Sequence, residues 1–225
     1  MQIGFDAKRA FLNTSGLGNY SRTLIQNFSE SHPQHNCFLY TPAVNSRYRH
    51  VINKSNIHIK TPSPHLFPFL WRSFSLTEEL EKDRLDIYHG LSHELPFNIK
   101  KTKIKTVLTI HDLIFLRYPQ WYSFFDRKVY ELKYKYSCRN ADKIIAISEQ
   151  SKQDIIHYFD IAPEKIQVLY QTCHTVFKTA ASAEQMKHIR KKYALPEEFI
   201  LHVGSITERK NLINLARAIN LLTAK

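Results

Sequence analysis

Short apolar runs recur along the chain and alternate with longer segments that have helical spacing. The runs have the length and the β-branched content that are typical of buried strands. They are Ile3–Phe5, Cys37–Tyr40, Ile57–Ile59, Ile87–Tyr88, Val107–Ile110, Ile144–Ile147 and the weaker Ile166–Leu169. Regular alternation of such strands with helices predicts an α/β fold with a mainly parallel, Rossmann-like sheet.

Apolar residues at helical spacing mark the segments between the strands. The first such stripe is Leu17, Tyr20, Leu24, Ile25 and Phe28, with Thr14 or Ser15 as the expected N-cap. A second stripe is Phe125, Val129, Leu132 and Tyr136, which we expect to face the core. The alternative is that the other aromatic side chains of this region, with its basic ones, form a surface for a lipid-linked or polyanionic acceptor. Those aromatic residues are Trp121, Phe124, Tyr130 and Tyr134.

The alternation lapses after residue 170, and this predicts a domain boundary. We expect residues 1–176 to form an N-terminal domain that binds the acceptor. Residues 177–225 are expected to form a linker and the first β-α unit of a second domain, with the strand at Phe199–Val203 and the helix at Leu212–Leu222. A complete α/β domain takes about 100–200 residues, so we expect the second domain to be incomplete.

Composition adds a strong basic charge. The chain has 225 residues and a formal net charge of +12. Residues 100–140 hold ten Lys and Arg against three Asp and Glu, a net of +7. Such a field attracts anionic lipids, nucleic acid or anionic substrates, and charge alone does not separate these partners. The three scattered cysteines indicate reduced thiols in a cytoplasmic protein.

Glycines mark two places where a strand runs into a helix. Gly16 and Gly18 follow the first strand, and Gly204 follows the expected strand at Phe199–Val203. Such a turn brings backbone amides close to a phosphate. After Gly204 come the adjacent cations Arg209 and Lys210, which indicate either a solvated basic turn or a site that binds an anion such as a diphosphate.

His111 and Asp112 stand at the end of the strand Val107–Ile110. One interpretation is a turn in which the aspartate caps the next segment. The other is a catalytic histidine, because ligands of open parallel sheets bind at the carboxyl ends of the strands. His89 and Gly90 end another strand, and there we expect a structural role.

Taken together, these segments resemble the retaining family-4 glycosyltransferases of the GT-B fold. The resemblance rests on Asn13–Tyr20, His111–Leu113, Ala141–Ser148 and the run G-x-x-x-x-R-K-N-L that begins at Gly204. It implies that Arg209 and Lys210 hold the diphosphate of a nucleotide-sugar, that Gly16 and Gly18 approach that phosphate, and that His111 contacts the donor sugar.

The resemblance also implies a function and its partners. The whole protein would transfer a hexose such as mannose from a nucleotide-sugar to a glycan or lipid-linked acceptor, with retention and without a metal or cofactor. The family has two glutamates seven residues apart deep in the donor domain, beyond the residues present here, so we expect the 225-residue chain alone to be inactive.

Other functions stay open at this point. The alternatives are a GT-B epimerase or phosphorylase, and a non-catalytic basic fragment that binds membrane or nucleic acid. We expect a cytoplasmic protein with peripheral contact to the inner, anionic face of the membrane. A nucleic-acid partner is not expected, because no motif of an RNA- or DNA-binding module occurs.

Overall fold

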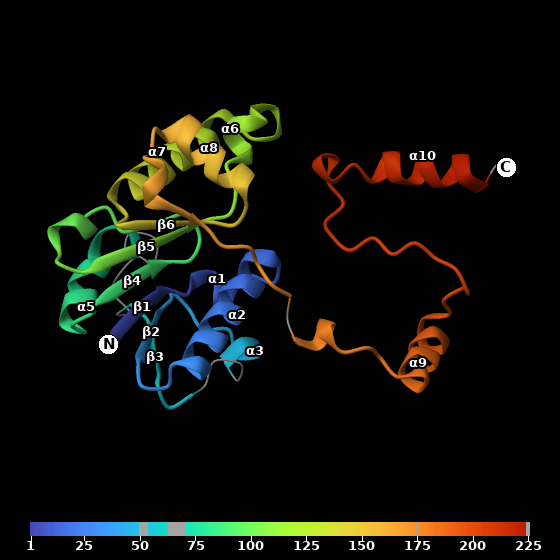
Figure 1. Cartoon of the computed structure of the whole chain (residues 1–225), viewed down its shortest axis with the longest axis horizontal. Helices are drawn as coiled ribbons and strands as arrows, with labels where there is room; N and C mark the ends of the chain where they lie inside the picture. Colours follow the sequence, from blue (N-terminus) through green and yellow to red (C-terminus); the bar gives the residue numbers. More distant parts are fainter. Residues whose placement is uncertain (50–53, 63–70, 174, 224–225) are drawn as a thin grey trace. The chain divides into compact units, whose positions relative to one another are not determined.

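The computed structural model describes residues 1–49, 54–62, 71–173 and 175–223. The chain divides into two compact units, Met1–Thr172 and Cys173–Lys225, which are coloured along the sequence in Figure 1. Each unit is described by itself below.

The first unit is built on a parallel sheet whose strands all fall on expected apolar runs. The described strands form one sheet in the order β3-β2-β1-β4-β5-β6-β7, and every neighbouring pair is parallel. Their bounds are β1 Gln2–Asp6, β2 Asn36–Tyr40, β3 Ile57–Lys60, β4 Ile87–Gly90, β5 Lys105–Ile110, β6 Lys143–Ala146 and β7 Ile166–Val168. The α/β expectation with a parallel, Rossmann-like sheet is confirmed.

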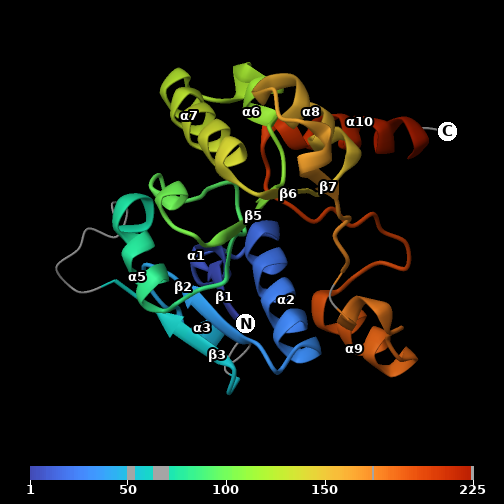
Figure 2. The same ribbon diagram turned by 60° about the vertical axis from the view of Figure 1, so that its left-hand side comes forward.

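The helices of the first unit cover both faces of this sheet (Figures 1 and 2). The α-helices are α1 Lys8–Leu12, α2 Gly16–Ser31, α3 Ser46–Arg49, α5 Leu76–Lys82, α6 Ile114–Arg117, α7 Phe124–Asn140 and α8 Glu149–Phe159. A π-helical turn, Trp71–Ser75, precedes α5, and 3-10 turns occupy Ile99–Lys101, Pro119–Trp121 and Pro163–Lys165. None of the described helices is long and apolar enough to cross a membrane.

Strand order reverses between β1 and β4, and this places the helices. The chain runs from β1 outward to β2 and β3, then returns to β4 and continues the other way. Because parallel crossovers are right-handed, helices before and after the return lie on opposite faces. The core agrees: Phe5, Leu39 and Ile25 share one buried cluster, whereas Leu80, Leu108 and Phe159 share another.

Helix α7 is rotated relative to our expectation. Its buried residues are Ser137 and Cys138, and Tyr130 and Tyr134 pack against the core. The stripe that we expected to face the core is turned outward, with Phe125, Val129 and Leu132 exposed. The prediction of a core-facing stripe was therefore wrong, since this helix has two apolar faces and periodicity alone does not distinguish them.

The second unit has helices and turns but no strand among its described residues. Its elements are the 3-10 turn Thr175–Lys178, α9 Ala183–Tyr193, the 3-10 turn Glu208–Lys210 and α10 Leu212–Thr223. The expected helix is confirmed as α10. The strand expected at Phe199–Val203 is absent from this segment, whose apolar side chains are exposed. A strand needs a hydrogen-bonded neighbour, and the segment has none among the described residues.

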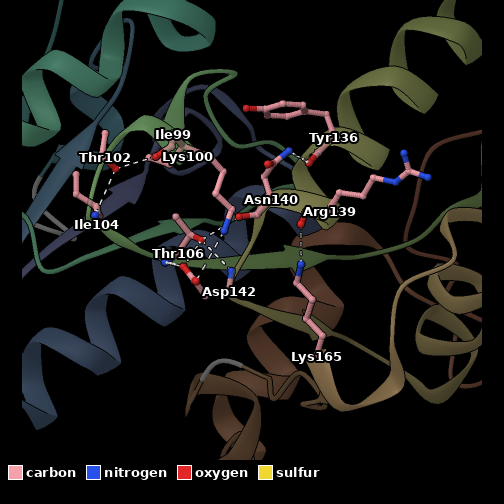
Figure 3. A network of polar contacts seen from close by, with 10 residues as sticks. All are labelled: Ile99, Lys100, Thr102, Ile104, Thr106, Tyr136, Arg139, Asn140, Asp142 and Lys165. Atoms are coloured by element: carbon pink, nitrogen blue, oxygen red, sulfur yellow. Dashed lines mark hydrogen bonds and ion pairs between the residues drawn. The ribbon is translucent and has the colours of Figure 1, made fainter.

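A polar network ties β5 to β6 at the edge opposite their carboxyl ends (Figure 3). The backbone N–H and the hydroxyl of Thr106 both donate to Asp142 Oδ2 at 2.8 Å, and the Asp142 N–H donates to Thr106 Oγ1 at 2.9 Å. Burial opposes ionisation of Asp142, but the bonds from Thr106 and the nearby lysines leave its pKa below the usual value. The aspartate of the Ala141–Ser148 motif thus has a structural role.

Thr106→Val is expected to destabilise the fold by about 1–3 kcal/mol, because Asp142 loses a hydroxyl that both donates to it and accepts from it. The measurement is urea denaturation at neutral pH. Thr102→Val is the matched control, since the Thr102 hydroxyl makes local bonds within one turn: it donates to Ile99 O at 2.8 Å and accepts from the Ile104 N–H at 3.3 Å. Equal losses in the two variants would contradict the role assigned to Asp142.

Candidate active site

His111 lies immediately after the carboxyl end of β5 and is only 6% exposed. Its Nε2 is 3.0 Å from the carbonyl oxygen of Leu91. Its Nδ1 is 3.1 Å from the side-chain amide nitrogen of Gln171. The ring of Tyr20 stands edge-on to the imidazole at a centroid distance of 4.7 Å.

These contacts define the state of the imidazole. A carbonyl oxygen only accepts, so Nε2 carries the proton and donates to Leu91. Nδ1 is then the unprotonated nitrogen and accepts from Gln171. Burial also lowers the pKa of His111. His111 is therefore a neutral imidazole whose only lone pair faces the side chain of Gln171, which is exposed.

Two further buried histidines lie beside His111 at the carboxyl ends of the strands. His89 Nε2 is 2.9 Å from Thr109 Oγ1, and the Tyr20 hydroxyl is 3.0 Å from the same oxygen. The ring of His93 is 5.2 Å from that of His111 and stacks on Tyr134 at 4.6 Å. The structural role expected for His89 is consistent with its buried hydrogen bond.

His93 is the residue that sequence reasoning missed. It has a left-handed backbone with φ of 69°, which is uncommon for a residue other than glycine. Its Nδ1 is buried and has no hydrogen-bond partner among the residues that the structure describes. Strained backbone and an orphaned polar atom often mark functional sites. The feature of the sequence that could have identified His93 is its position four residues after His89, in a loop that directly follows a strand.

The glycine loop is held by Asn13 and Arg22. Asn13 Oδ1 accepts hydrogen bonds from the N–H groups of Ser15 at 2.9 Å and Gly18 at 3.1 Å. Ser15 occupies the N-cap position as expected, but its own side chain does not cap α2. Arg22 Nη1 donates to the carbonyl oxygens of Ala10 at 2.7 Å and Asn13 at 2.9 Å.

The two glycines of this loop are not equivalent. A Cβ on Gly18 would lie 1.9 Å from the Asn13 carbonyl oxygen, whereas a Cβ on Gly16 would have no neighbour within 4 Å. Packing therefore requires glycine at position 18 only. Nothing in the described structure explains a glycine at position 16, and this leaves room for a role in ligand binding.

A charged network lines a hollow beside the carboxyl ends of β1 and β4. Arg72 is 3.1 Å from Asp6 Oδ2 and 2.7 Å from Glu94 Oε2, and Lys133 is 3.3 Å from the same Glu94 oxygen. These side chains, with Tyr88, line a small hollow of about 10 Å³, which is room for about one water molecule. Its fixed donors and acceptors of both charges can therefore bind a single water or hydroxyl group.

The cations of the second unit lie in a turn and not in a helix. Arg209 and Lys210 belong to the 3-10 turn Glu208–Lys210 and are exposed. Asn211, with a left-handed φ of 54°, separates them from α10. Both cations therefore lie just before α10 and outside its first turn. Neither cation has an ion-pair partner in the part of the chain that the structure describes, so both are accessible to an anion.

Within the described residues, no three His, Cys, Asp or Glu side chains are placed to bind one metal ion. The expectations of metal-independent chemistry and of no cofactor stay predictions. So do the roles of His111, Gly16, Gly18, Arg209 and Lys210, and the division at residue 176 into acceptor-side and donor-binding domains.

The sequence and the fold both identify a glycosyltransferase family. Residues 14–177 match the profile of Glycosyltransferase Family 4, and the chain belongs to that family. It is 32% identical over 145 residues to the serotype-specific mannosyltransferase WbdA of Escherichia coli, and the matched region covers 61% of this chain and 17% of that protein. An uncharacterised glycosyltransferase of Methanocaldococcus jannaschii, MJ1607, is 25% identical over 181 residues, or 74% of this chain and 46% of that protein. The chain thus spans less than half the length of these relatives.

Solved structures of glycosyltransferases share the fold. The structure of Anabaena Alr3699/HepE in complex with UDP and glucose has a TM-score of 0.57 at 14% identity, and the match covers 85% of this chain and 50% of that one. A glycosyltransferase from Rickettsia africae has a TM-score of 0.56 at 16% identity, with 87% and 50% covered. The expected GT-B class of the fold is confirmed.

Gly18→Ala and Gly16→Ala are expected to change stability in opposite directions. The added methyl group at position 18 collides with Asn13, and we expect a loss of about 1–3 kcal/mol. At position 16 alanine meets open space in a helix, so we expect no loss and a gain of up to about 1 kcal/mol. Chemical denaturation of both variants checks this. A loss at position 16 as large as that at position 18 would disprove the distinction.

Acid is expected to destabilise the first unit through its buried histidines. Burial, with a smaller contribution from His111, lowers the pKa of His89 to about 3, and burial lowers the pKa of His93 well below its usual value. The unfolded chain binds these protons below about pH 6.5, whereas the folded chain does not. The contribution of these histidines to the free energy of unfolding is therefore fully present above that pH. It is lost as the pH falls from there toward their pKa values in the folded chain.

The expected slope between pH 6 and 5 is about 1 kcal/mol per pH unit for each such histidine. Urea denaturation at stepped pH measures it. His89→Gln keeps a polar group near Thr109 but does not titrate, so it should reduce the slope by about one histidine's share. An unchanged slope in this variant would show that His89 is protonated in the folded state.

Proposed function

We propose that the whole protein transfers a hexose, with mannose the first candidate, from a nucleotide-sugar to a glycan or lipid-linked acceptor, with retention of configuration. The observation that carries this proposal is the environment of His111. A neutral, oriented imidazole lies at the carboxyl end of a parallel strand, against the helix that the glycine loop opens. Its family relatives that are named mannosyltransferases support the choice of sugar.

The donor side of this proposal rests on charge and chemistry. Arg209 and Lys210 are adjacent, exposed cations with no described ion-pair partner, and two adjacent cations suit a diphosphate. Gly16 carries no side chain and would let backbone amides approach a phosphate. The structures of HepE in complex with UDP and glucose and with UDP-glucose support a nucleotide-sugar as donor.

The acceptor side of this proposal rests on the first unit. The charged network of Asp6, Arg72, Glu94 and Lys133 offers hydrogen-bond donors and acceptors that are fixed by mutual ion pairs, and the hollow that they line has room for one hydroxyl group. Such fixed groups bind hydroxyls without a large ordering cost. His111 acts by orientation, because its Nδ1 lone pair accepts from a sugar hydroxyl once Gln171 moves aside. The proposed location is cytoplasmic, and no step of the proposal needs a metal.

The double variant Arg209→Ala/Lys210→Ala tests the donor site. We expect UDP, GDP or ADP at millimolar concentrations to shift the backbone NMR signals of Gly204–Asn211 in the unmodified chain. The double variant should weaken this binding at least about thirtyfold, the equivalent of ~2 kcal/mol for two charge-assisted contacts.

The matched control is Lys191→Ala/Lys192→Ala, which removes an equally adjacent and exposed basic pair from the last turn of α9. It should leave the binding unchanged. If both double variants weakened nucleotide binding equally, the binding would depend on the overall positive charge and not on the Arg209–Lys210 pair. No binding of any of the three nucleotides by the unmodified chain would overturn the donor assignment.

A further inference from the structure

Helix α7 presents an apolar stripe to solvent. Phe125 is 81% exposed, Leu132 66%, Phe124 62% and Val129 49%. Just before the helix, the exposed rings of Tyr118 and Trp121 stack on each other at 4.7 Å. Isolated apolar residues on a surface are common, but a contiguous stripe of this kind marks an interaction site.

Helix α7 is well packed although its apolar stripe faces solvent, because the opposite face of the helix makes the contacts with the core. Tyr134 stacks on His93, Ser137 Oγ accepts from the Leu95 N–H at 2.9 Å, and Cys138 is completely buried. The helix N-terminus is capped by Ser123, whose side chain accepts from the Asp126 N–H. A rotation that buried Phe125 would break all of these contacts.

Cations accompany the stripe. The helix holds Arg127, Lys128, Lys133, Lys135 and Arg139 against Asp126 and Glu131, a net of +3. At 100° per residue, Lys128, Lys135 and Arg139 fall on one flank of the line through Phe125 and Leu132. Neither Lys135 nor Arg139 has an ion-pair partner among the residues described. At the carboxyl end of the helix, Lys100 and Lys165 lie near Arg139 (Figure 3).

We propose that this face of α7 docks on an anionic membrane surface. Aromatic and aliphatic side chains flanked by lysine and arginine are the features of a helix that lies in the plane of the headgroups. The apolar side chains enter the acyl boundary, while the long cationic side chains reach the phosphates. A second copy of the chain fits less well, because two faces of charge +3 would repel each other.

The proposal is independent of the donor site, and it has a direct test. Sedimentation with vesicles compares pure phosphatidylcholine with a mixture that contains phosphatidylglycerol. We expect the chain to bind the mixed vesicles, to bind the neutral ones at least about tenfold more weakly, and to dissociate as salt is raised. Equal binding to both vesicles would overturn the role of the cations.

Two variants of α7 separate its apolar and basic parts. Phe125→Ser/Leu132→Ser removes two exposed apolar side chains, and Lys128→Glu/Lys135→Glu reverses two charges. Each should weaken binding to the mixed vesicles at least about tenfold. Because all four side chains lie outside the core, far-ultraviolet circular dichroism and thermal melting should show an unchanged fold.

The matched control lies in α10, another of the described helices with a strongly exposed apolar stripe. Ile213 is 69% and Leu221 73% exposed, so Ile213→Ser/Leu221→Ser removes a similar apolar area elsewhere. It should leave vesicle binding within about twofold. Loss of binding in the α10 variant with retention in the α7 variants would overturn the proposal. A second outcome would also overturn it. In that outcome the unmodified chain does not bind vesicles but forms a dimer in analytical ultracentrifugation, and the Phe125→Ser/Leu132→Ser variant does not form the dimer.

Discussion

The reversal of strand order between β1 and β4 is the constraint on which the first unit depends. Where order reverses, the crossover helices leave for opposite faces of the sheet, and ligands of such sheets bind outside the carboxyl ends of the two central strands. Asp6 and Gly90 end those strands, and the loop after Gly90 leads to His93. The side chains at this edge can therefore form a ligand-binding site, whereas the same residue types elsewhere in the sheet would be covered by helices.

The site at this edge is polar and buried, and its chemistry follows from that combination. A charged imidazole is costly in a buried place, so burial keeps His89, His93 and His111 neutral. Thr109 satisfies His89, and Leu91 and Gln171 satisfy His111. His93 alone retains an orphaned nitrogen. A neutral histidine cluster orients hydroxyl groups well, and this suits a reaction that depends on the position of a sugar.

Much of the first unit followed from the sequence, and the errors have physical reasons. The strands were found because β-branched runs between turns have few other stable states. The face of α7 was mistaken because Tyr130 and Tyr134 repeat at the same helical spacing as Phe125 and Val129, and only tertiary packing chooses between them. Phe199–Val203 has the composition of a strand, but a strand exists only with a partner. His111 was singled out by resemblance and its role stays a prediction, whereas His93 was missed because composition does not reveal a left-handed backbone.

Helix α7 joins the proposed membrane face to the candidate active site. On its inner side Tyr134 stacks on His93 at 4.6 Å, and His93 lies 5.2 Å from His111. A helix with its side chains is about 10 Å across, so His111 lies within roughly 20 Å of the surface that Phe125 and Leu132 would enter. Under the two proposals together, a helix that packs tightly on one side and stays apolar on the other would fix the depth at which the carboxyl edge of the sheet meets an acceptor that is anchored in the membrane.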